Sequence, residues 1–290
     1  MAINEKLKEN YVPRTLFVGL GGTGSSVVQM LAAKCRESET DNVSFVVLDT
    51  NVNDLEKVSS GQKLYAIQTS NTQSVGDYLN YDADALKNWF PKNPVLYDKT
   101  VSEGAGQVRA ISRLAFNSTI KTGRISKLYE AIDELFRKDG KELKQALRVV
   151  LVATAAGGTG SGIVLPISMF IRNYINEKYP NTAVIVRGLL MLPEILDSVI
   201  KTEVEKDSLR RNAYATIKEI NAFMMKGSGF FDIEPELQRY RNLHVDFSMP
   251  TTDELKSLDL LPFDFCFLFD GQNAEDNTLT SKKQYMEQAA

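Results

Sequence analysis

Two short apolar segments of this sequence each run directly into a glycine-rich loop and then into a helical pattern. The first segment is TLFVGL at residues 15–20, and the second is RVVLVAT at residues 148–154, which leads into AAGGTGSG at residues 155–162. Short runs rich in β-branched and aromatic residues that end in glycine are typical of strands buried on both faces. A chain with two such strand–loop–helix units is therefore restricted to folds in which strands and helices alternate.

The rest of the chain continues this alternation. Further apolar runs predict buried strands at 44–48 and 263–269, a strand at 182–192, a weaker strand at 63–67, and a strand pair near 243–249. Helical spacing of apolar residues predicts helices at 25–35, within 75–90, twice within 108–136 with a break near Gly123, and at 163–179, 203–225 and 280–290. This pattern indicates the α/β class, with a doubly wound, mostly parallel sheet and helices on both faces.

The composition fits a globular protein and argues against several classes of function. Of the 290 residues, 43% are hydrophobic, which suffices for one large domain or two small ones. The net charge of −3, without a long Lys/Arg run, argues against a nucleic-acid surface. Two cysteines, Cys35 and Cys266, and one histidine, His244, are too few for a zinc site and make a disulfide framework implausible.

The N-terminus, MAINEKLKEN, is polar and does not resemble a signal peptide. The longest apolar run, around residues 183–192, is interrupted by Arg187 and is shorter than the roughly 18 to 20 residues that a membrane span needs. We therefore expect a soluble cytoplasmic protein without a membrane span.

The first glycine loop, GLGGTGSS at residues 19–26, is a weak signal when taken alone. Glycine lacks a Cβ, so the loop can turn tightly and bring its N–H groups against a phosphate, and the helix behind it adds partial positive charge. The loop contains GxGxxG, and Asp49 at the end of the next strand could hold a ribose. These features also suit a dinucleotide-binding enzyme.

The second loop is more informative because it holds four glycines among the six residues from Gly157 to Gly162. So many glycines cost chain entropy without improving packing, and Thr159 and Ser161 add hydroxyl donors. The loop is not a P-loop because the lysine of GK(S/T) is missing. Its composition indicates a phosphate cradle.

The two loops together predict one shared site. In a doubly wound sheet, ligands bind at the switch point between the first strand and the strand that begins the second half. Both loops follow these strands, so a triphosphate could lie across them. A dinucleotide enzyme would need only the first loop.

The stretch AAGGTGSG resembles the tubulin signature GGGTGSG and the corresponding loop of FtsZ. The loop order also resembles that of the tubulin/FtsZ superfamily, because SEGAG at residues 102–106, followed by QVRA, is similar to the loop that senses the γ-phosphate. By this resemblance the phosphates contact Gly21, Gly22, Thr23, Gly24 and Ser25 of the first loop, Gly104, Ala105 and Gly106 of the middle loop, and Ala156, Gly157, Gly158, Thr159, Gly160 and Ser161 of the second loop.

The resemblance also assigns three roles outside these loops. RNAYA at residues 211–215 is similar to the helix whose arginine reaches the phosphates in FtsZ, which assigns that role to Arg211. In the same register Asp207 falls at the ribose-binding position, with Glu203 and Glu205 as rivals. Residues 263–273 resemble the sixth strand and the loop that reads guanine, so that role falls to Asn273 or Asp270.

The resemblance implies a cytoskeletal GTPase that binds GTP or GDP with Mg²⁺ and self-associates into filaments, where a neighbouring subunit completes the hydrolytic site. It also implies that residues 1–290 form the nucleotide-binding domain and end within the central helix, with the second domain absent. No segment of the sequence matches the acidic loop that would complete the neighbour's site, so hydrolysis by this chain alone is uncertain.

Two other functions remain open at the level of sequence. One is an NAD(P)-dependent oxidoreductase that uses GLGGTG and Asp49, with a ThiF-like adenylating enzyme as a variant. The other is a scaffold that keeps a nucleotide without hydrolysing it, which the missing acidic loop motivates.

Overall fold

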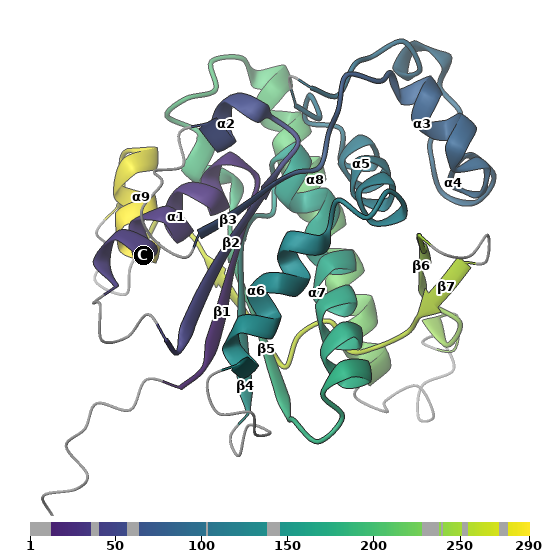
Figure 1. The fold of residues 1–290 in the computed structure, drawn as a ribbon. Helices are drawn as coiled ribbons and strands as arrows, with labels where there is room; N and C mark the ends of the chain where they lie inside the picture. The colour runs from purple at the N-terminus through teal and green to yellow at the C-terminus, as the bar shows by residue number, and fades with distance from the viewer. Residues whose placement is uncertain are drawn as a thin grey trace, which may run out of the picture.

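The structure of the protein is a computed structural model (Figure 1). The structure describes residues 13–35, 41–56, 64–102, 104–137, 146–227, 238, 240–250, 255–272 and 278–290. In this part of the chain, the helices are all too short or too polar to cross a membrane.

A six-stranded parallel sheet forms the centre of the molecule, in the order β3-β2-β1-β4-β5-β8. Its strands are β1 (Thr15–Leu20), β2 (Val43–Asp49), β3 (Leu64–Gln68), β4 (Leu147–Thr154), β5 (Val184–Met191) and β8 (Phe265–Phe269). The order runs outward from β1 to β3 and then from β4 to β8, as in a doubly wound fold. The predicted fold class is therefore confirmed, and the switch point lies between β1 and β4.

Helices cover both faces of the sheet because neighbouring residues of each strand point to opposite sides. One face packs against α5 (Arg109–Lys121), α6 (Ser126–Arg137) and α7 (Gly158–Lys178), and the other packs against α1 (Gly21–Lys34) (Figure 1). In β1, Leu16, Val18 and Leu20 enter the first core, while Phe17 packs against the second. Double coverage explains why the central strands are almost continuously apolar.

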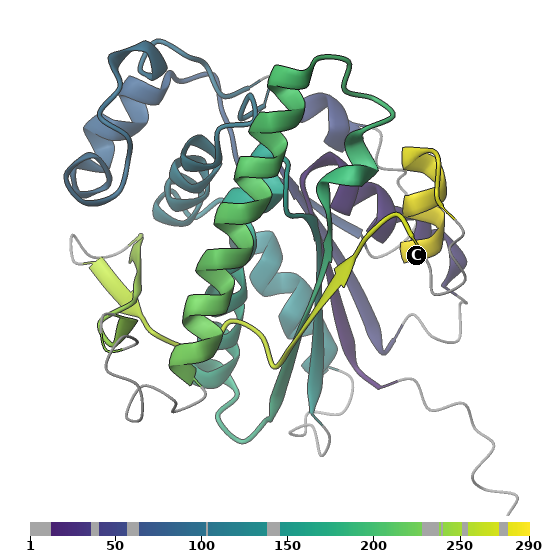
Figure 2. The same ribbon diagram turned by 180° about the vertical axis from the view of Figure 1, so that it is seen from behind.

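A long helix, α8 (Glu203–Gly227), lies beside α7 and contributes to both cores (Figure 2). Its Leu209 and Ala213 pack in the second core, whereas Ile220 and Phe223 pack in the first. The short helices α2 (Val52–Glu56) and α9 (Lys282–Ala289) and the 3-10 turn η3 (Pro193–Leu196) lie at the α1 side. The first turns of α1 and α7 directly follow β1 and β4, so they lie at the carboxyl edge of the parallel sheet. The turn η3, which follows β5, and the N-terminal part of α8 lie at the same edge.

The region between β3 and α5 forms a third cluster that packs on α5. It contains α3 (Val75–Tyr81), α4 (Ala83–Asn88) and the 3-10 turn η2 (Pro94–Leu96), so the single short helix expected here is two helices. Ser74 starts α3 with a reciprocal capping box to Asp77, which explains why a helix begins in this polar stretch.

Three other boundaries differ from the sequence-based predictions. α1 and α7 begin at Gly21 and Gly158, because the glycines form the first helical turns instead of separate loops. β6 (Val245–Ser248) pairs with β7 (Leu255–Leu258), so the partner strand lies outside the predicted pair. β8 is an edge strand in which Phe265, Phe267 and Leu268 are each 53% exposed, so its predicted burial is wrong.

Candidate functional site

The glycine-rich starts of α1 and α7 lie against each other at the switch point. A Cβ built on Gly21 would lie 3.1 Å from the backbone nitrogen of Gly160 and 3.4 Å from Cβ of Thr159. A Cβ on Gly160 would lie 3.0 Å from the carbonyl oxygen of Leu20. The predicted adjacency of the two loops is present, and a side chain at either glycine would disturb the contact.

Both helices present N–H groups that no side chain caps. The N-cap residues are Leu20 for α1 and Gly157 for α7, and neither provides a side-chain hydrogen bond. Neither first turn holds an acidic residue. The first four N–H groups of a helix have no partner within the helix, and together with the helix dipole they favour an anion. Two such helix starts side by side can therefore hold a group with several negative charges.

Some glycines of the two motifs are needed for close packing within the protein. A Cβ on Gly24 would overlap the carbonyl oxygen of Val152 in β4, and one on Gly162 would overlap Ser112 Oγ and the carbonyl of Arg109 in α5. These two glycines allow α1 to approach the sheet and α7 to approach α5. The phosphate contact expected of Gly24 would be made by its backbone N–H and stays a prediction.

A third loop, residues 104–107, lies over the start of α7. Gly104, Gly106 and Gln107 have positive φ angles of 113°, 55° and 62°. A Cβ on Gly158 would lie 3.0 Å from Cα of Gln107 and 3.1 Å from Cβ of Ala105. The structure thus brings the predicted middle loop to the second glycine motif, while Glu103 lies outside the described residues.

α8 holds this arrangement with a residue that the sequence analysis missed. The side-chain amide of Asn212 donates to the carbonyl oxygens of Gln107, at 2.9 Å, and Ala156, at 3.0 Å. One turn later, the hydroxyl of Thr216 donates to the carbonyl of Ala155 at 3.0 Å. Because one amide bridges two loops, Asn212 fixes their relative position.

The hydroxyl groups of the second motif are used within the protein. Thr159 Oγ1 donates to Asp49 Oδ1 at 3.1 Å and contacts Thr50 Oγ1 at 2.8 Å, and the Ser161 hydroxyl donates to the carbonyl of Gly157. Both hydroxyls are therefore engaged within the protein in this structure, and their contact with a phosphate stays a prediction. In the first motif, Ser25 Oγ is buried without a partner among the described residues.

Asp49 is a buried carboxylate beneath the first glycine motif. It is 2% exposed, and its Oδ2 has no hydrogen-bond partner in the described part of the chain. Burial raises the pKa of Asp49 to about 6, against the lowering effect of hydrogen bonds from Asn51 and Thr159, and the nearby charge of Asp54 raises it further. A Cβ on Gly22 would lie 2.9 Å from Asp54 Oδ2 and 3.8 Å from Asp49 Oδ2. The burial of Asp49 does not favour its alternative role as a ribose ligand for a dinucleotide.

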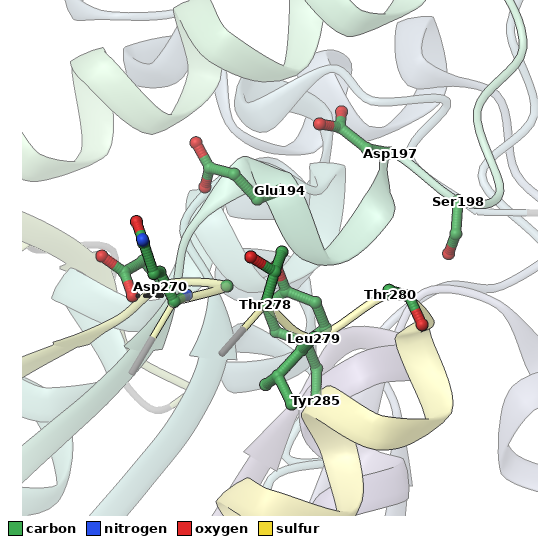
Figure 3. Close-up of a pocket in the computed structure, with 10 residues that line it drawn as sticks. Glu194, Asp197, Ser198, Asp270, Thr278, Leu279, Thr280 and Tyr285 are labelled. Atoms are coloured by element: carbon green, nitrogen blue, oxygen red, sulfur yellow. Dashed lines mark hydrogen bonds between the residues drawn. The ribbon is translucent and has the colours of Figure 1, made fainter. Parts of the chain in front are cut away.

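A polar cavity of about 600 Å³ lies at the same edge of the sheet, after the ends of β5 and β8 (Figure 3). Its lining includes Glu194 and Asp197 near η3, Asp270 after β8, and Tyr285 of α9. Asp270 is exposed, and its Oδ1 accepts a hydrogen bond from the backbone of Gln272 at 3.1 Å. Three carboxylates in one cavity suit a ligand rich in hydrogen-bond donors and repel phosphates.

Other predicted residues occupy the exposed surface of α8. Asp207 pairs with Arg210 at 3.2 Å, Glu203 pairs with Lys206 at 3.4 Å, and Glu205 accepts a hydrogen bond from the Thr202 hydroxyl at 2.6 Å. Arg211 is exposed and makes no hydrogen bond or ion pair with the part of the chain that the structure describes. Asn273 lies outside the described residues.

Comparison with known proteins gives one match to a family model, described as "Tubulin like", over residues 16–290. No curated protein matches the chain.

The fold is similar to three solved structures at low sequence identity. These are a GTPγS-form protofilament of TubZ from Bacillus thuringiensis serovar israelensis (14% identity, 74% of this chain and 43% of that chain, TM-score 0.42), CetZ from Methanosaeta thermophila (11%, 96% and 51%, 0.45) and a GDP-bound monomer of CetZ1 from Haloferax volcanii (13%, 95% and 57%, 0.48). The chain spans about half the length of these three proteins.

Proposed function

The chain belongs to the tubulin-like family, and from this premise we propose that it binds a guanine nucleotide, GTP or GDP, across the tips of β1 and β4. The observation that carries the proposal is the contact between the two glycine-rich helix starts, where a Cβ on Gly21 would lie 3.1 Å from the nitrogen of Gly160. A single phosphate chain can reach uncapped N–H groups of both helices at this point.

The phosphates would be held mainly by backbone. Thr159 and Ser161 direct their hydroxyls into the protein, so the donors available to a ligand are N–H groups of the two first turns and of residues 105–107, since the N–H of Gly104 donates to the carbonyl of Val101. Such donors are fixed in place before the ligand arrives and cost little reorganisation on binding. Arg211, exposed on α8, would add a positive charge, and Asp207 on the same helix would accept from the ribose.

Mg²⁺ fits the acidic pair beside the first motif. Mg²⁺ is usually bound by one or two carboxylates together with phosphate oxygens and water. Asp49 has a buried oxygen without a partner in the described residues, and Asp54 lies beside Gly22. In the proposed complex these two carboxylates would hold Mg²⁺, directly or through water, and the ion would neutralise phosphate charge.

The base and ribose would lie toward the cavity after β5 and β8. Guanine presents N–H donors on its Watson–Crick edge, and a carboxylate or an amide oxygen can accept them. Asp270 lines this cavity, and Asn273 follows three residues later. We assign the guanine-reading role to this segment. The affinities for GTP and for ATP are compared in Asp270→Ala and in Asn273→Ala, and the variant that loses the preference for GTP identifies the residue that reads the base.

Self-association into filaments and hydrolysis that depends on a neighbouring subunit complete the proposal. Both rest on family membership. The described residues offer N–H groups that can stabilise charge on the phosphates. They include no segment that matches the acidic loop with which one subunit would complete the hydrolytic site of its neighbour. A scaffold that keeps nucleotide without turnover is the alternative within the same binding site.

The test begins with mass spectrometry of nucleotide released from the purified protein. Calorimetry with GTP, GDP, ATP and NADH in the presence of Mg²⁺ follows, and turnover is then measured over a range of protein concentrations. We expect GTP or GDP to bind in preference to ATP and NADH. Absence of guanine-nucleotide binding, or tight NADH binding with GTP excluded, would refute the proposal. Phosphate release that rises more steeply than protein concentration would support a neighbour-dependent GTPase over a scaffold.

A further inference from the structure

A second, smaller cavity of about 140 Å³ lies behind the start of α7, between α5, α7, α8 and β6. Its polar lining consists of Arg109, Arg113, Trp89 and Glu219, and Leu165, Pro166 and Val245 are among its apolar lining residues. We call it the Arg113 cavity. It is too small for a nucleotide, because pockets for ligands of drug size are roughly 300 to 1,000 Å³.

Arg113 contacts an aromatic ring in this cavity but has no hydrogen-bond partner among the described residues. Its guanidinium lies over the ring of Trp89, 4.2 Å from the centroid, and its Nε is buried without a hydrogen-bond partner. The side chain makes no hydrogen bond or ion pair with any residue that the structure describes. A cation–π contact uses the face of the guanidinium and leaves the N–H groups along its edge available.

The acidic groups around Arg113 are committed elsewhere. Glu219 pairs with Arg109, whose Nη1 donates to Glu219 Oε1 at 3.0 Å. Asp246 accepts from the Ser257 hydroxyl and lies 3.5 Å from His244, and Asp82 caps α4 through the backbone of Ala85 at 3.2 Å. Of the cavity's charges, Arg109 and Glu219 compensate each other, so the positive charge of Arg113 remains.

The Arg113 side chain is partly withdrawn from water, so leaving its charge without an anion costs free energy. Burial, the largest effect, lowers the pKa of Arg113, and the positive charge of Arg109 lowers it too, while Glu219, Asp246 and Asp82 act in the opposite direction. Arginine nevertheless stays protonated in proteins. Arg113 is partly exposed as a residue, and its Nε is buried. A guanidinium with unused donors is stabilised most strongly by a planar anion that accepts two parallel hydrogen bonds.

We propose that the Arg113 cavity binds a carboxylate group, held along the edge of the Arg113 guanidinium. The apolar side chains of Leu165, Pro166 and Val245 would contact a short aliphatic part attached to that carboxylate. The cavity is reached from the surface at Glu219, whose side chain is 49% exposed. Nothing in the guanine-nucleotide proposal requires this site, so either can fail without the other.

The experiment uses Trp89 as its reporter, because it is the only tryptophan of the chain. The full chain is titrated with sodium acetate and sodium propionate while Trp89 emission is followed, and sodium chloride at equal ionic strength is the reference. We expect a saturable change with both carboxylates, with propionate binding more tightly, and no saturable change with chloride. A response to carboxylates no larger than that to chloride would overturn the proposal.

Three variants test whether Arg113 carries the response. Arg113→Gln should weaken carboxylate binding about tenfold or more, because the charged bidentate donor is lost. Arg113→Lys keeps the charge but not the planar fork, and should also bind more weakly. Arg187→Gln is the matched control, because Arg187 also lies over an aromatic ring, Phe265, but outside the cavity, and it should respond as the wild type does.

Thermal unfolding gives a second readout that does not depend on fluorescence. Carboxylate should raise the Tm of the wild type and of Arg187→Gln, but not that of Arg113→Gln. An equal rise in all three proteins would overturn the proposal.

A dilution series then identifies the source of the carboxylate. Emission that responds to added propionate at every protein concentration indicates a free small carboxylate. Emission that changes only with protein concentration, and only with Arg113 present, indicates an acidic side chain from a second copy of the chain. A concentration-dependent change that persists in Arg113→Gln would count against the site.

Discussion

The starts of α1 and α7 have similar glycine-rich sequences, but their glycines make different contacts. In α1, Gly24 packs the helix onto the backbone of β4 at Val152. In α7, Gly158 faces residues 104–107, Gly160 faces the end of β1, and Gly162 faces α5. The start of α1 is thus anchored to the sheet, whereas the start of α7 is the point at which several segments meet.

This difference explains how a phosphate site can be built without a lysine. At the start of α7, the glycines let three neighbouring segments approach closely, and one of them brings the backbone N–H of Gln107 to 3.0 Å from the Cβ position of Gly158. The start of α1 supplies a rigid second wall at Gly21 and Gly22. A substitution in this region should therefore affect the stability of the fold, the contact between α7 and residues 104–107, or the space for a ligand, according to which contact it changes.

The largest effect on stability is expected for Gly24→Ala. An added Cβ would overlap the carbonyl oxygen of Val152 in a central strand, which cannot move without displacing the sheet. The cost should be about 3 kcal/mol or more, beyond what the better helix propensity of alanine returns. Urea unfolding measures the change. A loss below about 1 kcal/mol would mean that α1 is not anchored in this way.

Asp49 joins the two helix starts and should make stability depend on pH. Because burial raises its pKa to about 6, the folded protein keeps a proton that the unfolded chain has already lost. Stability without nucleotide or Mg²⁺ should fall as pH rises from about 4 to about 6, by up to about 3 kcal/mol, and stay level above that range.

Asp49→Asn keeps the shape of the side chain and removes this titration. The variant should be more stable than the wild type at pH 8 and lose the advantage near pH 4, in unfolding curves recorded at both values. Its Mg²⁺-dependent affinity for nucleotide should decrease, because the carboxylate beside Gly22 is gone. Equal pH profiles for the two proteins would show that Asp49 is not buried as a carboxylate.

Asn212→Ala should separate the start of α7 from residues 104–107. The substitution removes the amide that donates to Gln107 and Ala156, so stability should fall by about 1 to 2 kcal/mol. Arg211→Ala, its neighbour, is the matched control, because Arg211 is exposed and its loss should leave stability within about 0.5 kcal/mol. Similar losses for both variants would contradict the bridging role of Asn212.

Most of the sheet could be predicted because its central strands are covered on both faces and are continuously apolar. The adjacency of the two glycine motifs also followed, since parallel strands around a switch point end at one edge. The exposure of β8 could not be predicted, because FCFLF has the composition of a buried strand and only its edge position exposes Phe265, Phe267 and Leu268.

The inward position of Asn212 could have been predicted from the spacing of residues along α8. Buried residues at 209, 213, 216, 220 and 223 define the inner stripe of α8, and this spacing turns position 212 inward and position 211 outward. The resemblance instead assigns the functional role on this helix to Arg211, the preceding residue. The surroundings of Asp49 could not be predicted from the sequence, since the hydroxyl that donates to it belongs to Thr159, which lies 110 residues away in sequence.

The smallest effect on stability is expected for Gly22→Ala. The new Cβ would face the flexible side chain of Asp54, at 2.9 Å from Oδ2, and alanine favours the helix, so stability should stay within about 0.5 kcal/mol of the wild type. The methyl group would occupy space beside the N–H groups proposed to bind phosphate, and GTP affinity measured by calorimetry should fall about tenfold or more, or roughly 1.4 kcal/mol. Together with Gly24→Ala, this variant separates the two uses of glycine within one helix turn, because one should lose the fold and the other the ligand. If Gly22→Ala bound GTP as the wild type does, the phosphates would not lie over the start of α1.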